Sequence, residues 1–252
     1  MHESKMHDES SFVTLTYDNE HLPSDESLSV EHCQLFLKRL RYHLEPKRIR
    51  FFLCGEYGSK LGRPHYHAII FGWFPEDRKL IKGEGEFSLW SSATLQDAWG
   101  LGFASIGRVS FESASYVANY ATKKVNGPKA AEHYGGRLPE FLLMSRRPGI
   151  GRPWFDKYGS DVFPSDEVIV RGVKCRPPRY YDQLLAVRNP DELERLKLKR
   201  ELAADKLEEM VLTCGESVNV VLSRNGRRLP DLEAVAKAKL AMKSRSLEAD
   251  NA

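Results

Sequence analysis

Residues 63–71 constrain the fold of this chain more than any other segment. They read Arg-Pro-His-Tyr-His-Ala-Ile-Ile-Phe, and their β-branched and aromatic residues predict a strand. Alternate side chains of a strand share a face, so His65 and His67 project together while Tyr66 points to the opposite side. Two imidazoles on one strand face can hold a divalent metal. The alternative is a pair of surface histidines on an edge strand.

A carboxylate lies on a second predicted strand, residues 48–57. Two glycines in residues 58–63 predict a turn, so the two strands can form an antiparallel hairpin. Glu56 then lies near the start of the histidine strand, on a face that depends on the register. In favourable register Glu56, His65 and His67 supply one oxygen and two nitrogen ligands and leave positions open for water or substrate, as catalytic metal sites do. Otherwise Glu56 is a solvated acid at a strand end.

A predicted helix over residues 113–124 offers a nucleophile. Serines near its start can cap it, and Asn-Gly-Pro at residues 126–128 predicts its end. Tyr116 and Tyr120 are four residues apart and lie one turn above each other, and Lys123 falls on the same face. The alternative is that both tyrosines pack as core residues of an amphipathic helix.

The ordered combination of these motifs resembles one family. Pro-His-Tyr-His at residues 64–67, Cys-Gly-Glu-Tyr-Gly at 54–58 and Tyr-Val-Ala-Asn-Tyr-Ala-Thr-Lys at 116–123 look like the His-hydrophobic-His (HUH) endonucleases. Within them, the match is to replication initiators of small single-stranded DNA phages, the microviruses. Segments 11–17, 145–151 and 176–181 are also similar to microvirus initiators, so the resemblance covers roughly residues 11–181. Such initiators usually carry an additional stretch ahead of the segment that begins here with Met1, and we expect its DNA contacts to be missing.

The resemblance implies an origin-specific, metal-dependent DNA endonuclease and strand transferase. Tyr116 and Tyr120 would alternate as nucleophiles that form a 5′-phosphotyrosine link, leave a 3′-hydroxyl primer for rolling-circle replication and rejoin the strand. Lys123 would lower the pKa of a neighbouring phenol or pair with the phosphate. Glu56, His65 and His67 would hold Mg²⁺ or Mn²⁺. The expected partners are single-stranded or supercoiled viral origin DNA, a host helicase and a host polymerase.

Composition allows this function without demanding it. The formal charge of the 252 residues is +3, which permits nucleic-acid binding. Basic residues accompany aromatic ones beyond residue 123, and we expect DNA contacts from Lys124, Arg146, Arg147 and Arg152. No Cys-x-x-Cys motif, long apolar run or phosphate-binding loop motif is present. We therefore expect no membrane partner, and a location in the host cytoplasm.

The order of predicted elements gives the fold class. Strands at residues 11–17, 49–57, 65–73 and 102–109 alternate with helices near residues 30–45, 93–99 and 113–124. This order predicts an α+β fold, a mainly antiparallel central sheet with helices on one face. It agrees with the modified ferredoxin-like fold that the resemblance implies. We expect an endonuclease domain over residues 1–180 and an irregular, then charged and helical, C-terminal extension over 181–252.

Three other functions remain open at this point. A plasmid- or transposon-type HUH nuclease would use similar residues, often with a single tyrosine. A non-catalytic basic DNA-binding protein would use the histidines and tyrosines as packing. An unrelated metal hydrolase would activate water and form no covalent adduct with DNA.

Overall fold

The computed structural model describes residues 1–58, 61–85 and 88–214, except for the side chains of residues 120–123 and 205–214. The chain divides into two compact units, Met1–Trp154 and Phe155–Ala252. The helices in the described ranges include none with the length and apolar character needed to span a bilayer.

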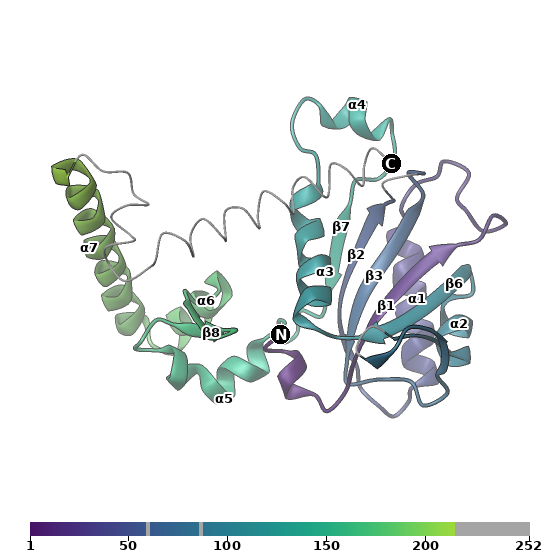
Figure 1. Ribbon diagram of the computed structural model, residues 1–252, viewed down its shortest axis with the longest axis horizontal. Coiled ribbons are helices and arrows are strands. Elements are labelled where there is room, and N and C mark those ends of the chain that lie inside the picture. The colour runs from purple at the N-terminus through teal and green to yellow at the C-terminus, as the bar shows by residue number, and fades with distance from the viewer. Residues whose placement is uncertain (59–60, 86–87, 215–252) are drawn as a thin grey trace. The chain divides into compact units, whose positions relative to one another are not determined.

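A seven-stranded sheet forms the centre of the first unit (Figure 1), with strand order β4-β5-β6-β1-β3-β2-β7. All paired neighbours in it run antiparallel. The strands are β1 Ser10–Tyr17, β2 Arg50–Tyr57, β3 Pro64–Phe71, β4 Lys79–Lys82, β5 Leu89–Ser91, β6 Gly102–Arg108 and β7 Phe141–Met144. The predicted α+β class is confirmed, and the histidine strand β3 lies near the middle of the sheet.

Helices cover both faces of this sheet. Figure 1 shows α1 (Val30–His43) and α2 (Ala93–Trp99) on one side and α3 (Phe111–Lys123) on the other. The predicted placement of all helices on one face was therefore wrong for α3. The reason is that the strands are apolar on both faces, and Val117 of α3 packs with Ile69 and Phe71 of β3. The short segments η1 (Ser4–Met6) and α4 (Ala130–Tyr134) complete the helices of this unit.

Serine caps fix the starts of the two helices that flank the sheet. Ser29 accepts a hydrogen bond from the backbone N–H of His32 at the start of α1. The side chain of Ser110 accepts from the N–H of Ser113, and Ser113 accepts in return from the N–H of Ser110, so α3 begins with a reciprocal capping box. Helix α3, which carries Tyr116, therefore has a well-defined first turn.

Two predicted boundaries differ from the structure. Strands β4 and β5 pair across the Gly- and Lys-rich stretch that was interpreted as a loop, and β4 is fully exposed, which hides the alternation that marks a half-buried strand. A single strand predicted over residues 168–173 is instead a hairpin of β8 (Val168–Val170) and β9 (Val173–Cys175). The chain reverses between them through Arg171 and Gly172, which both have positive φ.

The second unit contains helices α5 (Arg152–Val162, which begins at the end of the first unit), α6 (Arg179–Arg188) and α7 (Pro190–Cys214). The ring of Phe155 lies 5.2 Å from that of Tyr181, measured between centroids. The guanidinium of Arg200 donates to both Asp166 and Asp182. A boundary at residue 180, as the sequence suggested, would divide this set of contacts. Residues 215–252 of the predicted extension lie outside the described residues.

Candidate active site

The register of the β2–β3 hairpin decides the face that Glu56 occupies. Glu56 pairs with His65, and Cys54 pairs with His67. Directly opposed residues point to the same face of a sheet, so Glu56 joins both histidines. This face is the one covered by α3, while Tyr66, between the histidines, is fully buried on the α1 face.

The three side chains converge on one carboxylate oxygen. Oε1 of Glu56 lies 2.8 Å from Nε2 of His65 and 2.8 Å from Nε2 of His67. The ligand atoms of all three residues lie within 4.8 Å of one another, and among the described residues this is the single group of three potential metal ligands. Glu56 and His67 are buried, whereas His65 remains 19% exposed at its side chain. The cluster is thus reached from the His65 side.

Contacts at the other ring nitrogens orient both imidazoles. Nδ1 of His67 lies 3.0 Å from Oγ1 of Thr14, and Nδ1 of His65 lies 3.2 Å from the carbonyl oxygen of Arg63. Because a carbonyl oxygen only accepts, Nδ1 of His65 carries the hydrogen, and Nε2 of the neutral ring turns a lone pair toward Glu56. A lone pair and a carboxylate oxygen at this distance repel unless a proton or cation joins them. The residues present therefore fit a divalent metal with mixed nitrogen and oxygen ligands.

The ionisation of Glu56 depends on its histidine neighbours. Burial by itself would raise the pKa of this carboxyl group, and it is the largest single effect. Hydrogen bonds from His65 and His67, together with their charge, outweigh burial, so the pKa of Glu56 is lowered from its usual value. The carboxylate form, which a metal ligand requires, is therefore favoured in the folded protein.

Tyr116 of α3 reaches the same cluster. Its hydroxyl lies 3.5 Å from Oε1 of Glu56, to which it donates, and its ring packs edge-on against His67 with centroids 5.1 Å apart. The ring of Phe12 in β1 contacts both, stacking on His67 at 5.5 Å and meeting Tyr116 at 6.5 Å. Tyr116 is nonetheless 46% exposed. A phenol that touches the buried carboxylate and still faces solvent can meet a substrate.

The remaining predicted catalytic residues are on the same helix. Tyr120 lies one turn after Tyr116 and Lys123 ends α3, but the side chains of both lie outside the described residues. Lys124, at the end of the helix, is exposed. The roles assigned to these residues stay predictions.

The other predicted DNA-binding residues are not gathered at the cluster. Arg146 and Arg147 are exposed in a turn closed by the Arg146–Gly149 bridge after β7, and Arg152 is half-buried at the start of α5. Arg146 lines a groove together with Leu37 and Arg41 of α1, on the face of the sheet opposite the histidines. A DNA contact by Arg146 would therefore extend away from the cluster.

Two residues of the site were missed at the level of sequence. Thr14 and Phe12 lie on β1, at alternate positions, on the same face as the histidines. Their strand was singled out as a motif, and its alternation of polar and apolar residues was the available signal. Their pairing with β3 was not, because it joins residues about fifty positions apart.

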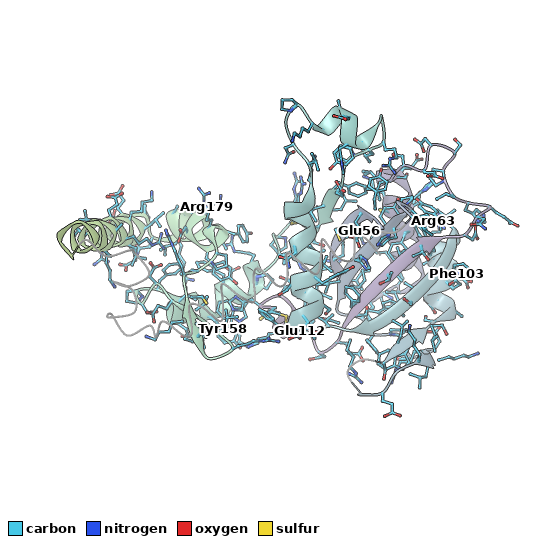
Figure 2. All side chains as sticks on the ribbon, turned by 45° about the horizontal axis from the view of Figure 1, so that its top comes forward. Glu56, Arg63, Phe103, Glu112, Tyr158 and Arg179 are labelled. Carbon is cyan, nitrogen blue, oxygen red and sulfur yellow. The ribbon has the colours of Figure 1, made fainter. Side chains whose placement is uncertain are left out.

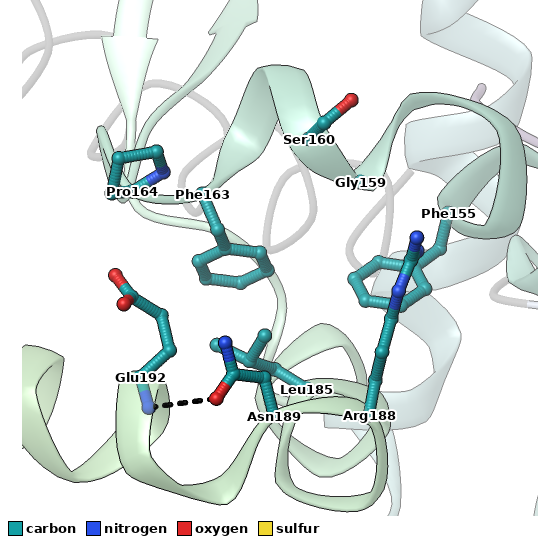
Figure 3. Close-up of a pocket in the computed structure, with 9 residues that line it drawn as sticks. All are labelled: Phe155, Gly159, Ser160, Phe163, Pro164, Leu185, Arg188, Asn189 and Glu192. Carbon is teal, nitrogen blue, oxygen red and sulfur yellow. Dashed lines mark hydrogen bonds between the residues drawn. The ribbon is translucent and has the colours of Figure 1, made fainter.

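A separate pocket of about 290 Å³ lies in the second unit (Figure 3). Its walls include Phe155 and Phe163 from the α5 region and Leu185 and Arg188 of α6. The backbone N–H of Glu192 donates to Oδ1 of Asn189 at its edge. Its lining has one carboxylate and no histidine or tyrosine, so it offers neither the metal ligands nor the nucleophile of the α3 face.

Comparison with known proteins places the chain in a family. Residues 10–125, which run from β1 to just beyond α3, match the family model for replication-associated proteins of the ORF2 type. The "Replication-associated protein VP4" of Bdellovibrio phage phiMH2K is 35% identical over 219 residues, 83% of this chain and 68% of that protein. The chain belongs to this family of replication-associated proteins. The matched segment contains Glu56, both histidines and Tyr116, but not Arg146, Arg147 or Arg152.

Two further relatives carry related names. The "Replication-associated protein ORF2" of Spiroplasma virus 4 is 35% identical over 211 residues, 77% of this chain and 64% of that protein. The "Replication-associated protein ORF4" of Chlamydia phage 1 is 31% identical over 192 residues, 73% of this chain and 47% of that protein. The chain thus spans between about half and two thirds of the length of these family members. No solved structure matches it.

Proposed function

We propose that this protein initiates rolling-circle replication of a phage genome by nicking one DNA strand at the origin through a tyrosine. The observation that carries the proposal is the half-exposed phenol of Tyr116, 3.5 Å from the carboxylate of Glu56 and beside two imidazoles. Membership of a family of replication-associated proteins supports a role in replication. It also supports action inside the host cell.

The chemistry conserves the energy of the cleaved bond. The oxygen of Tyr116 attacks the scissile phosphorus and loses its proton, the bond from phosphorus to the 3′-oxygen breaks, and that oxygen takes up a proton. A 5′-phosphotyrosine and a free 3′-hydroxyl result, and a polymerase can extend the latter. Attack by the 3′-hydroxyl of a completed strand on the phosphotyrosine reverses these steps and rejoins the DNA.

The residues around Tyr116 have separate tasks. A phenol is a weak nucleophile because its ordinary pKa is about 10. The Glu56 carboxylate accepts the phenol hydrogen bond and so orients the oxygen. A divalent ion, Mg²⁺ or Mn²⁺, held by Glu56, His65 and His67 supplies positive charge that polarises a phosphate oxygen. Thr14 holds the ring of His67 in the orientation that keeps Nε2 facing the cluster.

A second tyrosine fits a continuous replication cycle. Tyr120 lies one helical turn from Tyr116, so the two phenols can approach one phosphate site in turn. One would hold the displaced strand while the other cuts after a full round. Lys123, three residues further, would pair with the phosphate or lower the pKa of a phenol. Lys124, Arg146, Arg147 and Arg152 would contact the DNA backbone. A host helicase and polymerase would supply strand separation and synthesis.

The test is a covalent trapping assay. Labelled single strands that tile the DNA carrying the gene are incubated with protein and Mn²⁺, and denaturing gels separate free strands, cleaved strands and protein-linked strands. We expect one tile to yield a protein-linked product. Cleavage without a link would identify a water-activating metal nuclease, and binding without cleavage would identify a non-catalytic DNA-binding protein, so either result would overturn the proposal.

A further inference from the structure

A row of four side chains crosses the sheet from the candidate site to an exposed aromatic ring. Glu56 pairs with His65, His65 pairs with Thr16, and Thr16 pairs with Phe103 of β6. Residues opposed in this way share a face, so Phe103 points to the same side as the histidines. Two strand spacings separate it from His65, or about 10 Å. Figure 2 shows Glu56 and Phe103 on the same sheet.

Phe103 is exposed although its neighbours along the strand are not. It is 71% exposed, whereas Ala104 and Ile106, on the opposite face of β6, are buried in the core. Around it on the histidine face lie Thr16 and Ser105, which are partly exposed and carry hydroxyl groups. The described residues thus leave a flat aromatic surface beside hydrogen-bonding groups, close to the candidate active site.

The backbone beneath Phe103 is held on both sides. The side-chain amide of Gln96 in α2 donates to the carbonyl oxygen of Gly102 and accepts from the N–H of Ala104. Oγ1 of Thr16 donates to the carbonyl oxygen of Phe103. Gly102 has φ of 143°, and a Cβ there would lie 2.3 Å from the backbone nitrogen of Asp18, so only glycine permits this close approach of β6 to β1. The ring is therefore presented from a fixed support.

We propose that Phe103 is a stacking platform for a base of the single-stranded DNA, next to the cleaved phosphate. The inference rests on the proposed function, because it takes the Glu56–His65–His67 cluster as the place where the strand is cut. A strand whose scissile phosphate lies at the cluster and whose backbone follows the row toward β6 brings a neighbouring base over this ring.

The chemistry of the surface favours a nucleobase. Every base has a flat face that can stack on an aromatic ring, and bases of a single strand are free to turn outward. A platform that is already rigid costs less ordering free energy on binding than a mobile side chain. The hydroxyls of Thr16 and Ser105 can donate to or accept from the edge of a stacked base or its sugar.

The experiment measures equilibrium binding in a metal chelator, so that cleavage cannot occur. The probe is a fluorescein-labelled oligothymidylate, and the second probe is a chain of the same length with abasic sites in place of thymidines. Phe103→Leu keeps an apolar side chain and removes the aromatic face. We expect it to weaken binding of oligothymidylate by about fivefold or more. Phe103→Trp should bind at least as well as the natural protein.

Three controls separate stacking from other causes. Tyr42→Leu alters another exposed aromatic residue, 75% exposed on α1 beyond the opposite face, and should leave binding unchanged. On the abasic chain, Phe103→Leu and the natural protein should bind equally, because no base remains to stack. The dependence of affinity on salt should also be unchanged in Phe103→Leu, since an apolar ring releases no counterion, whereas Lys124→Ala should make that dependence shallower.

The proposal fails if Phe103→Leu binds oligothymidylate as tightly as the natural protein. It also fails if the variant loses as much affinity for the abasic chain, since the effect would then lie in the backbone contacts or the fold. Neither result depends on cleavage, so a failure here leaves the covalent trapping assay to judge the nicking activity separately.

Discussion

On the sheet face beneath α1 and α2, polar side chains satisfy one another in the core. The hydroxyls of Tyr17 and Tyr66 lie 2.8 Å apart, and Tyr66 also accepts from the backbone N–H of Ser29. On the face beneath α3, the hydroxyl of Tyr116 touches a carboxylate while the side chain stays half-exposed. The same residue type is thus packing material on one face and an accessible phenol on the other. Accessibility beside a charged cluster, rather than residue type, distinguishes the candidate site.

The two faces also differ in the protonation of these phenols. Burial is the largest effect on Tyr17 and raises its pKa to about 12, and burial likewise raises the pKa of Tyr66. A phenol with a raised pKa is harder to convert into the nucleophilic phenolate. The tyrosines of the core face are therefore unsuited to attack on phosphorus in both access and ionisation.

The largest effect is expected from the histidines of β3. His65→Ala, or His67→Ala, should reduce metal-dependent cleavage by about a hundredfold or more, because each change removes an expected metal ligand from the α3 face. Tyr66→Phe, between them but on the other face, is the matched control and should cleave at nearly the natural rate. Cleavage is measured on the tile that gives the covalent product. Full cleavage by the double histidine variant at ordinary Mg²⁺ or Mn²⁺ concentrations would contradict the metal assignment.

A distinct pattern is expected from the tyrosines of α3. Tyr116→Phe and Tyr120→Phe should each retain some protein-linked DNA in a single round, because either phenol can reach the phosphate, whereas the double variant should form none. DNA binding should persist in all three, since the basic residues carry backbone affinity. Tyr17→Phe is the control from the core face. Mass spectrometry of the linked peptide identifies the nucleophile, and a link to Tyr17, Tyr57 or Tyr134 would contradict the choice of helix.

An intermediate effect is expected from Glu56. Glu56→Gln keeps the size of the side chain and removes its negative charge, so two imidazoles alone would hold the ion. The metal concentration that gives half-maximal cleavage should rise about tenfold or more, while the rate at saturating metal should fall less. The measurement is a Mn²⁺ titration of cleavage. An unchanged titration curve would reduce Glu56 to a structural partner of the histidines.

The smallest effect concerns stability at high pH and tests the core face. The pKa of Tyr17 is about 12 in the folded protein and about 10 in an unfolded chain, so between these values the unfolded state releases a proton that the folded state retains. Stability should therefore fall as the pH rises from about 10 to 12. In Tyr17→Phe this fall should be shallower, as judged by chemical denaturation at several pH values. An equally steep fall in the variant would assign it to other groups.

Local patterns in the sequence predicted much of this structure, and long-range pairings explain what they missed. The Ser29 cap and the apolar spacing of Cys33, Phe36, Leu37 and Leu40 were sufficient to predict α1, because these signals lie within one helix. Glu56 was paired with the histidines through a short turn. Phe103, in contrast, joins the row through two distant strand pairings, and no local pattern encodes them.

The capping box at Ser110 and Ser113 sets the angular phase of α3. Each residue of a helix turns the next by about 100°, so the number of residues between this fixed start and Tyr116 determines the direction in which the phenol points. A single inserted alanine before Tyr116 would swing the hydroxyl about a quarter turn away from Glu56 without altering any residue of the site. The first turn of α3 therefore acts as the zero mark of a protractor, and catalysis by this helix depends on counting from it.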